Sequence, residues 1–151
     1  AMIVHATCLS LFTPKGWCGV LIFGDSGVGK SDLALRALDS GFRLVADDYS
    51  RLWTSGQTLF AAAPDRTRDR IEVRGLGILR EPARAFTPLH LAIKAQSETP
   101  ERLPDPERLT LLDTHLPCLR LVPTEASALA KLQRALDCVM NPSWSGPHFV
   151  L

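Results

Sequence analysis

An eight-residue glycine-rich motif is the feature of this chain that most restricts its fold. Residues 24–31 read Gly-Asp-Ser-Gly-Val-Gly-Lys-Ser and match the pattern G-x-x-x-x-G-K-[ST]. The apolar run Gly19–Phe23 precedes the motif, and leucines at helical spacing follow it as far as Leu38. A glycine-rich loop between a buried strand and a helix N-terminus lets backbone N–H groups converge on phosphate oxygens. The motif therefore predicts a phosphate-binding loop, or P-loop, in an α/β fold.

Each residue type in the motif has a chemical part in phosphate binding. The glycines allow the backbone to approach the phosphates, and Lys30 is long enough to reach the β- and γ-phosphate oxygens. The Ser31 hydroxyl is placed to ligate Mg²⁺. The alternative is a tight strand-to-helix turn with an exposed lysine. We expect the nucleotide to contact the whole loop, which comprises Gly24, Asp25, Ser26, Gly27, Val28, Gly29, Lys30 and Ser31.

Two adjacent carboxylates form a second candidate site. Asp47 and Asp48 directly follow the apolar run Arg43–Ala46, and ligands in α/β folds bind at the carboxyl ends of such strands. Neighbouring side chains on an extended chain point to opposite sides, so one carboxylate can face a metal while the other faces a nucleophile. A solvated turn is the alternative.

Patterns outside the motif give the expected order of elements. Short apolar runs between turn residues predict strands, and apolar residues at helical spacing predict two helices. The expected strands cover Ile3–Phe12, Gly19–Phe23, Arg43–Ala46, Arg51–Thr54, Thr58–Ala61, Ile71–Val73, His90–Ala95 and Leu116–Val122, and the expected helices run from Ser31 to Ser40 and from Thr124 to about Met140. Strand, loop, helix and strand in succession indicate a parallel βαβ core. We expect a P-loop-containing, three-layer-like α/β domain with a central mixed sheet and a C-terminal helix.

Two proline-containing segments have their own expected places in this fold. Residues 97–108 contain three prolines and several charged side chains, and we expect them to form a surface connection. Pro117 lies near the start of the last expected strand and favours a position toward a sheet edge, because proline lacks the N–H group that a central strand needs.

Composition excludes several other classes of protein. The 151 residues contain 17 Lys or Arg and 16 Asp or Glu, a formal charge of +1, which does not indicate a nucleic-acid-binding tail. Apolar runs are far shorter than the roughly 20 residues needed to cross a bilayer, so we expect a cytoplasmic protein without a membrane anchor. The four cysteines show no metal-binding spacing, and we expect free thiols.

Three motifs together resemble a known family. The P-loop is followed by LVADD at Leu44–Asp48 and by IEVRGLGIL at Ile71–Leu79. This combination is similar to the C-terminal catalytic domain of the bacterial HPr kinase/phosphorylase. Longer members carry a separate N-terminal domain, and we expect this chain to be a short form without one, with residues 1–151 as a single P-loop kinase domain.

The resemblance implies a serine protein kinase that uses ATP and Mg²⁺ and acts on the phosphocarrier protein HPr. It implies that Asp47 is the general base toward the acceptor serine, and the general acid in the reverse reaction. Lys30 would act on the transferred phosphate, with His5 close to it. By the same resemblance, Ser31, Asp48 and Glu72 would hold Mg²⁺, and Arg74 matches the arginine of the family signature. Family members form hexamers, which makes a homo-oligomer an expectation here.

One segment departs from the family pattern. Near Leu116–Leu129 the family carries a strand that runs into PVRPGRN, a segment associated with dephosphorylation, whereas this chain reads LRLVPTEASAL there. We therefore expect kinase activity with at most weak reverse phosphorylase activity. Two other functions fit the motifs: a small P-loop kinase for a metabolite or nucleotide, with Arg66, Arg68 and Arg70 as a short lid, or a nucleotide-sensing module without turnover.

Overall fold

The computed structural model describes residues 1–144 and shows a mixed α/β fold. Its two α-helices are α1 (Lys30–Leu38) and α2 (Ala128–Met140), and single 3-10 turns cover Asp65–Thr67 and Pro142–Trp144. Neither α-helix has the length and apolarity that crossing a membrane requires. The strands are β1 (Met2–Val4), β2 (Ala6–Thr13), β3 (Gly16–Phe23), β4 (Arg43–Ala46), β5 (Ser50–Ser55), β6 (Thr58–Ala62), β7 (Arg70–Val73), β8 (Gly77–Arg80), β9 (Thr87–Ala95), β10 (Glu107–Leu111) and β11 (Thr114–Leu121).

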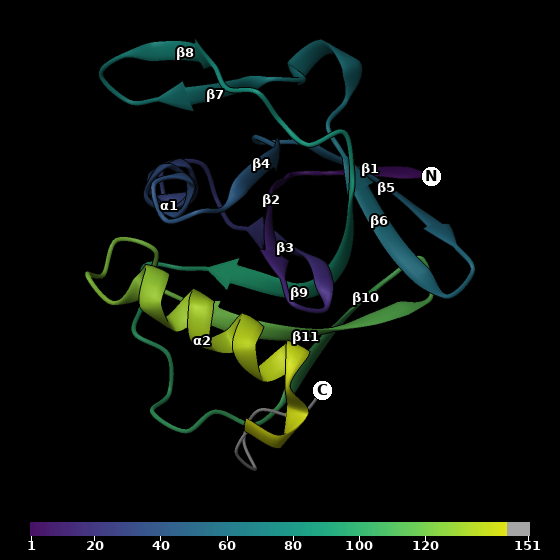
Figure 1. Ribbon diagram of the computed structural model, residues 1–151. Helices are drawn as coiled ribbons and strands as arrows, with labels where there is room; N and C mark the ends of the chain where they lie inside the picture. The colour runs from purple at the N-terminus through teal and green to yellow at the C-terminus, as the bar shows by residue number, and fades with distance from the viewer. Residues whose placement is uncertain (145–151) are drawn as a thin grey trace.

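Most of the strands form one large, curled, mixed sheet (Figure 1). Its strand order is β1-β5-β6-β9-β3-β2-β4, and β11 runs parallel to β9 while pairing with β10 on its other side. Strands β7 and β8 form a separate two-stranded hairpin above α1. The central mixed sheet and the C-terminal helix confirm the expected fold class.

Two apolar clusters fill the two faces of this sheet. Both helices pack on the same face, where Leu33 of α1 and Leu132 of α2 belong to one cluster with Val20 and Ile22. Leu21, which points the opposite way along β3, belongs to the second cluster, between the sheet and the strands that curl over it. The layers are therefore helices, sheet and curled strands.

The expected parallel βαβ core is interrupted by one strand. β3 and β4 run in the same direction, but β2 lies between them and is antiparallel to both, with Ala6 opposite Phe23 and Cys8 opposite Ala46. As a result, the N-terminal end of β2 lies beside the C-terminal ends of β3 and β4. The P-loop follows β3 and the paired aspartates follow β4, so this inserted strand brings His5 to the same edge of the sheet.

Some expected boundaries were wrong. Helix α2 begins at Ala128 instead of Thr124, because two turns precede it, with hydrogen bonds from the Glu125 N–H to the Val122 carbonyl (3.2 Å) and from the Ala128 N–H to the Glu125 carbonyl (3.1 Å). Residues 97–108, which were expected to form a surface connection, end in strand β10. The sequence did not predict this strand because its half-exposed and exposed residues form no apolar run. Pro117 pairs with Arg108 of β10, in the half of β11 that does not contact β9.

Candidate functional site

The P-loop closes tightly onto the start of α1. Gly29 is the residue before the helix and has φ 112°, a left-handed conformation that strains any residue with a side chain. Its carbonyl accepts the Leu33 N–H at 3.0 Å. A Cβ atom at this position would lie 3.0 Å from Cγ2 of Thr124, so the loop also packs against the segment that leads into α2. The first N–H groups of α1 have no partner within the helix and are available to phosphate oxygens.

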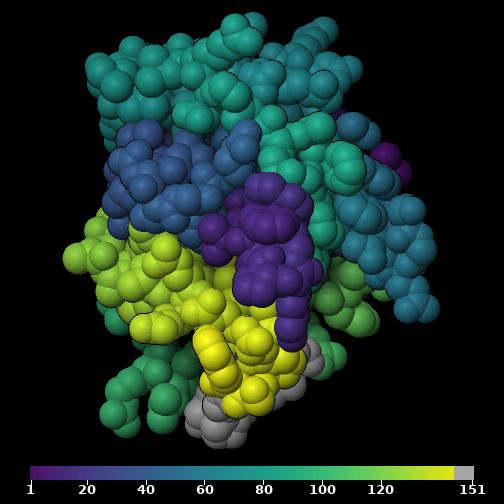
Figure 2. Space-filling model, in the orientation of Figure 1, coloured from purple at the N-terminus to yellow at the C-terminus, as the bar shows by residue number. Residues whose placement is uncertain are grey.

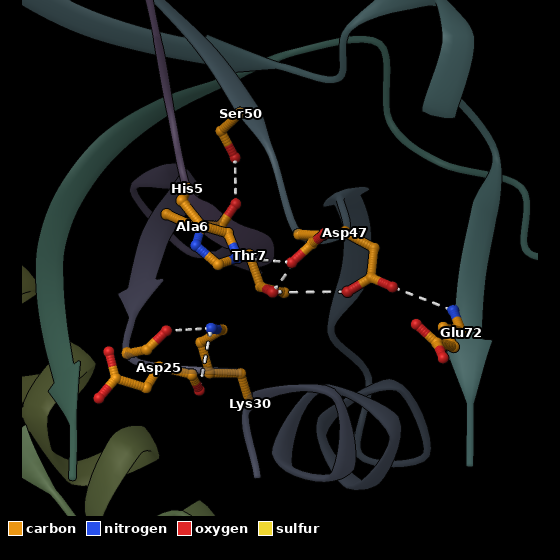
Figure 3. A network of polar contacts seen from close by, with 10 residues as sticks. His5, Ala6, Thr7, Asp25, Lys30, Asp47, Ser50 and Glu72 are labelled. Carbon is orange, nitrogen blue, oxygen red and sulfur yellow. Dashed lines mark hydrogen bonds and ion pairs between the residues drawn. The ribbon is translucent and has the colours of Figure 1, made fainter. Parts of the chain in front are cut away.

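The Lys30 side chain lies over the loop. Its ammonium group donates to the carbonyl oxygen of Gly24 and, at 3.4 Å, to that of Asp25 (Figure 3). The residue is only 6% exposed. A buried cation held by backbone carbonyls, and not by a carboxylate, keeps its full charge available to an incoming phosphate group.

A cleft of about 520 Å³, here called the P-loop cleft, gathers most of the predicted site residues. Those that line it are Asp25, Ser26, Gly27, Gly29, Lys30, Ser31, Asp48, Glu72 and Arg74. Asp32, Leu35, Val73 and Thr124 complete the lining. Gly24, Val28, His5 and Asp47 do not line it, and neither do the arginines considered as a lid.

Asp47 lies behind the P-loop cleft and connects two strands. It is 7% exposed, and its Oδ2 accepts the backbone N–H of Glu72 at 3.0 Å while its Oδ1 accepts the Thr7 hydroxyl at 3.4 Å (Figure 3). Burial raises the pKa of Asp47, the neighbouring charges of Asp48 and Glu72 raise it further, and the two hydrogen bonds oppose this shift. The carboxylate thus fixes β7, and with it Glu72, beside the end of β4.

Asp48 lies on the cleft side and pairs with His5. Its backbone is left-handed, with φ 66°, and its Oδ1 lies 2.7 Å from Nε2 of His5. Because a carboxylate only accepts hydrogen bonds, Nε2 of His5 carries the hydrogen. The His5 ring stacks on Tyr49, with ring centroids 5.0 Å apart and planes 24° apart. Asp48 therefore lines the P-loop cleft, whereas Asp47 is buried behind it.

Sequence reasoning missed Thr7, Tyr49 and Thr124. The Thr7 hydroxyl bonds Asp47 and lies 3.4 Å from the Asp48 N–H. In the expected strand Ile3–Phe12, Thr7 is two residues from His5 and shares its face, so this signal was available in the sequence. Tyr49 and Thr124 had no such signal, because their positions depend on contacts between distant segments.

The donor set of the P-loop cleft fits a magnesium ion bound together with phosphate. Ser31, Asp48 and Glu72 supply one hydroxyl and two carboxylates to the same cleft. Within residues 1–144, no group of three or more His, Cys, Asp or Glu side chains is close enough to bind a metal without other ligands. Mg²⁺ in phosphoryl-transfer sites is usually held by one or two carboxylates, phosphate oxygens and water, so these residues suffice.

Comparisons with known proteins place the chain near one family. The sequence model of the family described as HPr Serine kinase C-terminal domain matches residues 1–86. An HPr kinase/phosphorylase from Bacillus cytotoxicus is 38% identical over 111 residues, covering 65% of this chain and 36% of the relative. An HPr kinase/phosphorylase from Chromobacterium violaceum is 46% identical over 78 residues, covering 51% of this chain and 23% of the relative.

A solved structure extends the similarity beyond the P-loop half. The Hpr(Ser) kinase/phosphatase from Coxiella burnetii matches with a TM-score of 0.72 and 26% identity, covering 89% of this chain and 97% of that one. The chain spans about a third or less of the length of the curated relatives named above. The match of the family model over more than half of the residues, together with this shared fold, shows that the chain belongs to the HPr serine kinase C-terminal domain family.

Proposed function

We propose that this chain is a single catalytic domain that transfers the γ-phosphoryl group of ATP to a serine of an HPr-type phosphocarrier protein. The observation that carries the proposal is the position of Asp48, which lines the P-loop cleft and is hydrogen-bonded by His5. In this position the carboxylate can accept the proton of an acceptor hydroxyl, a step that phosphoryl transfer requires. Family membership supports the choice of HPr as the acceptor.

The proposed step is an in-line displacement with Asp48 as general base. The serine oxygen forms a bond to the γ-phosphorus, its proton passes to the Asp48 carboxylate, and the bond between the γ-phosphorus and the bridging oxygen breaks with its electron pair leaving on ADP. The hydrogen bond from His5 holds the carboxylate in one orientation. Asp47 has both oxygens engaged and is buried, so its proposed role is to position Glu72.

The remaining residues supply charge and orientation. Lys30 and the N–H groups at the start of α1 bind the β- and γ-phosphates, and Arg74, which also lines the P-loop cleft, adds a cation. Ser31 and Glu72 would hold Mg²⁺, which, when bound, neutralises charge that develops between the β- and γ-phosphates. The His5 contact leaves Asp48 free to accept the proton.

Incubation with Mg-ATP and candidate HPr proteins tests this function. We expect one phosphoryl group on a serine of HPr, located by mass mapping of the product. Nucleoside monophosphates and small hydroxyl metabolites serve as competing acceptors. Transfer to a small acceptor with none to HPr would identify a metabolite kinase, and Mg-ATP binding without any transfer would identify a sensing module.

The reverse reaction is expected to be weak. It requires inorganic phosphate to bind beside phosphoserine, and two anions repel each other unless additional donors receive them. Near the P-loop, the segment Pro123–Glu125 offers carbonyl groups that accept hydrogen bonds from Arg36, which leaves this guanidinium already engaged. Release of pyrophosphate from serine-phosphorylated HPr, measured with phosphate and without ATP, should therefore be much slower than forward transfer. Equal rates would show that other cations, such as Arg74, receive the second anion.

A further inference from the structure

The β7–β8 hairpin has one face that nothing covers within residues 1–144. Its strands pair only with each other. The register sets Arg70 opposite Arg80 and also sets Glu72 opposite Ile78. Side chains alternate along a strand, so these four residues share the outward face, while Ile71 on the other face is buried in the cluster with α1. Figure 2 shows this part of the chain, in teal, as a ridge above the blue helix α1.

Two like charges oppose each other on this outward face. Arg70 and Arg80 are cross-strand partners, and neither takes part in an ion pair within residues 1–144. Like charges directly opposite one another destabilise a strand pair. An anionic group between the two guanidinium groups would relieve this repulsion. A shallow surface hollow lies there, lined by Arg68, Asp69, Arg70, Ile78, Leu79 and Arg80.

The same hairpin exposes apolar side chains. Leu76, in the turn, and Ile78, on the outward face, are each 71% exposed. Aliphatic side chains grouped with unpaired arginines are typical of surfaces that bind another protein, whereas a free phosphate would contact the arginines alone. The combination fits a protein that presents an acidic group next to an apolar one.

We propose that the outward face of the β7–β8 hairpin docks the acceptor protein, an inference that rests on the proposed kinase function. Arg70 and Glu72 are two residues apart on one strand, so they lie about 7 Å apart on the same face. Glu72 also lines the P-loop cleft. The docking face is therefore continuous with the wall of the cleft. A folded protein that inserts a serine there contacts the hairpin at the same time.

Paired substitutions on the hairpin test this docking surface. Leu76→Ser with Ile78→Ser removes the apolar contact, and Arg70→Glu with Arg80→Glu reverses the charge while leaving two like charges opposed. For each pair we expect the KM for the HPr-type acceptor to rise about tenfold or more, with kcat and the Kd for Mg-ATP unchanged. The charge-reversed variant should also lose most of the salt dependence of the wild-type KM.

A matched control and the wild-type protein separate the possible outcomes. Arg102→Glu with Leu103→Ser changes an arginine and a 58% exposed leucine outside the P-loop cleft, and should leave the KM unaltered. Unchanged KM values in the hairpin variants would overturn the docking proposal alone. If the hairpin variants differed from the wild-type protein in molar mass but not in KM, the docking proposal would be wrong and the hairpin would instead be a contact between copies of the chain. A wild-type protein that transfers phosphate to no HPr-type acceptor would overturn the proposed function as well.

Discussion

Asp48→Asn is expected to lower the rate of transfer to HPr by about 10³-fold. The amide occupies the same space but does not accept the proton of the serine hydroxyl. The side chain is 58% exposed, and its hydrogen bond with His5 links two exposed side chains, so the fold should not depend on it. The Kd for Mg-ATP and the Mg²⁺ concentration for half-maximal binding should remain near the wild-type values. A large rise in the Mg²⁺ requirement would instead make Asp48 a metal ligand, as the family resemblance implies.

Asp47→Asn is the matched comparison for this experiment. The amide oxygen still accepts the Glu72 N–H, so we expect a smaller loss of transfer than for Asp48→Asn. Because burial raises the pKa of Asp47, the native state holds a proton to higher pH than the unfolded state, and the free energy of unfolding decreases as pH rises through that interval. The Asn variant should lack this pH dependence in thermal unfolding. A greater loss of transfer from Asp47→Asn than from Asp48→Asn would restore Asp47 as the base.

Lys30→Ala is expected to reduce kcat/KM for transfer by about 10³-fold and to weaken ATP binding strongly. The substitution removes the fixed cation that the structure holds over the P-loop. Equilibrium titration with nucleotide and a transfer assay with saturating HPr would measure the two effects.

Lys15→Ala is the control for this change. The Lys15 ammonium also donates to a backbone carbonyl, that of Met140 at 2.6 Å, but it lies outside the P-loop cleft. Nucleotide binding and phosphoryl transfer should both be unchanged in the Lys15→Ala variant. If Lys30→Ala left transfer unaltered, the assignment of the phosphate-binding loop would be wrong.

The sequence was informative where local rules determine structure. The pattern around residues 24–31 fixes the order of strand, loop and helix, and β4 covers the predicted residues Arg43–Ala46. Strands β5 and β6 likewise cover the predicted strands Arg51–Thr54 and Thr58–Ala61. In each of these cases the signal lies within a few neighbouring residues.

The arrangement of the site depends on contacts between segments that lie far apart in the sequence, which no local pattern predicts. Alternation predicts that Asp47 and Asp48 face different ways, but which one faces the cleft depends on the strand beside β4. That neighbour is β2, an antiparallel strand from the start of the chain. In addition, the backbone at Asp48 has a φ angle of 66°, in the left-handed region that Asp adopts more readily than most other residues with a side chain, and this interrupts regular alternation.

Strand β4 lies at the edge of the sheet, so its local opening is expected to cost less free energy than the opening of β3. Strand β3, which leads into the P-loop, lies between β2 and β9, whereas β4 pairs only with β2 among residues 1–144. Beyond this pairing, β4 has one further backbone hydrogen bond, from the Arg84 N–H to the Leu44 carbonyl at 2.8 Å. Edge elements open locally at a lower free energy than the whole domain unfolds. Amide protons of β4 should therefore exchange with solvent sooner than those of β3. As denaturant is added, the chain would then pass through a form that still retains nucleotide but no longer holds Asp48 against His5, so that catalysis is lost before binding.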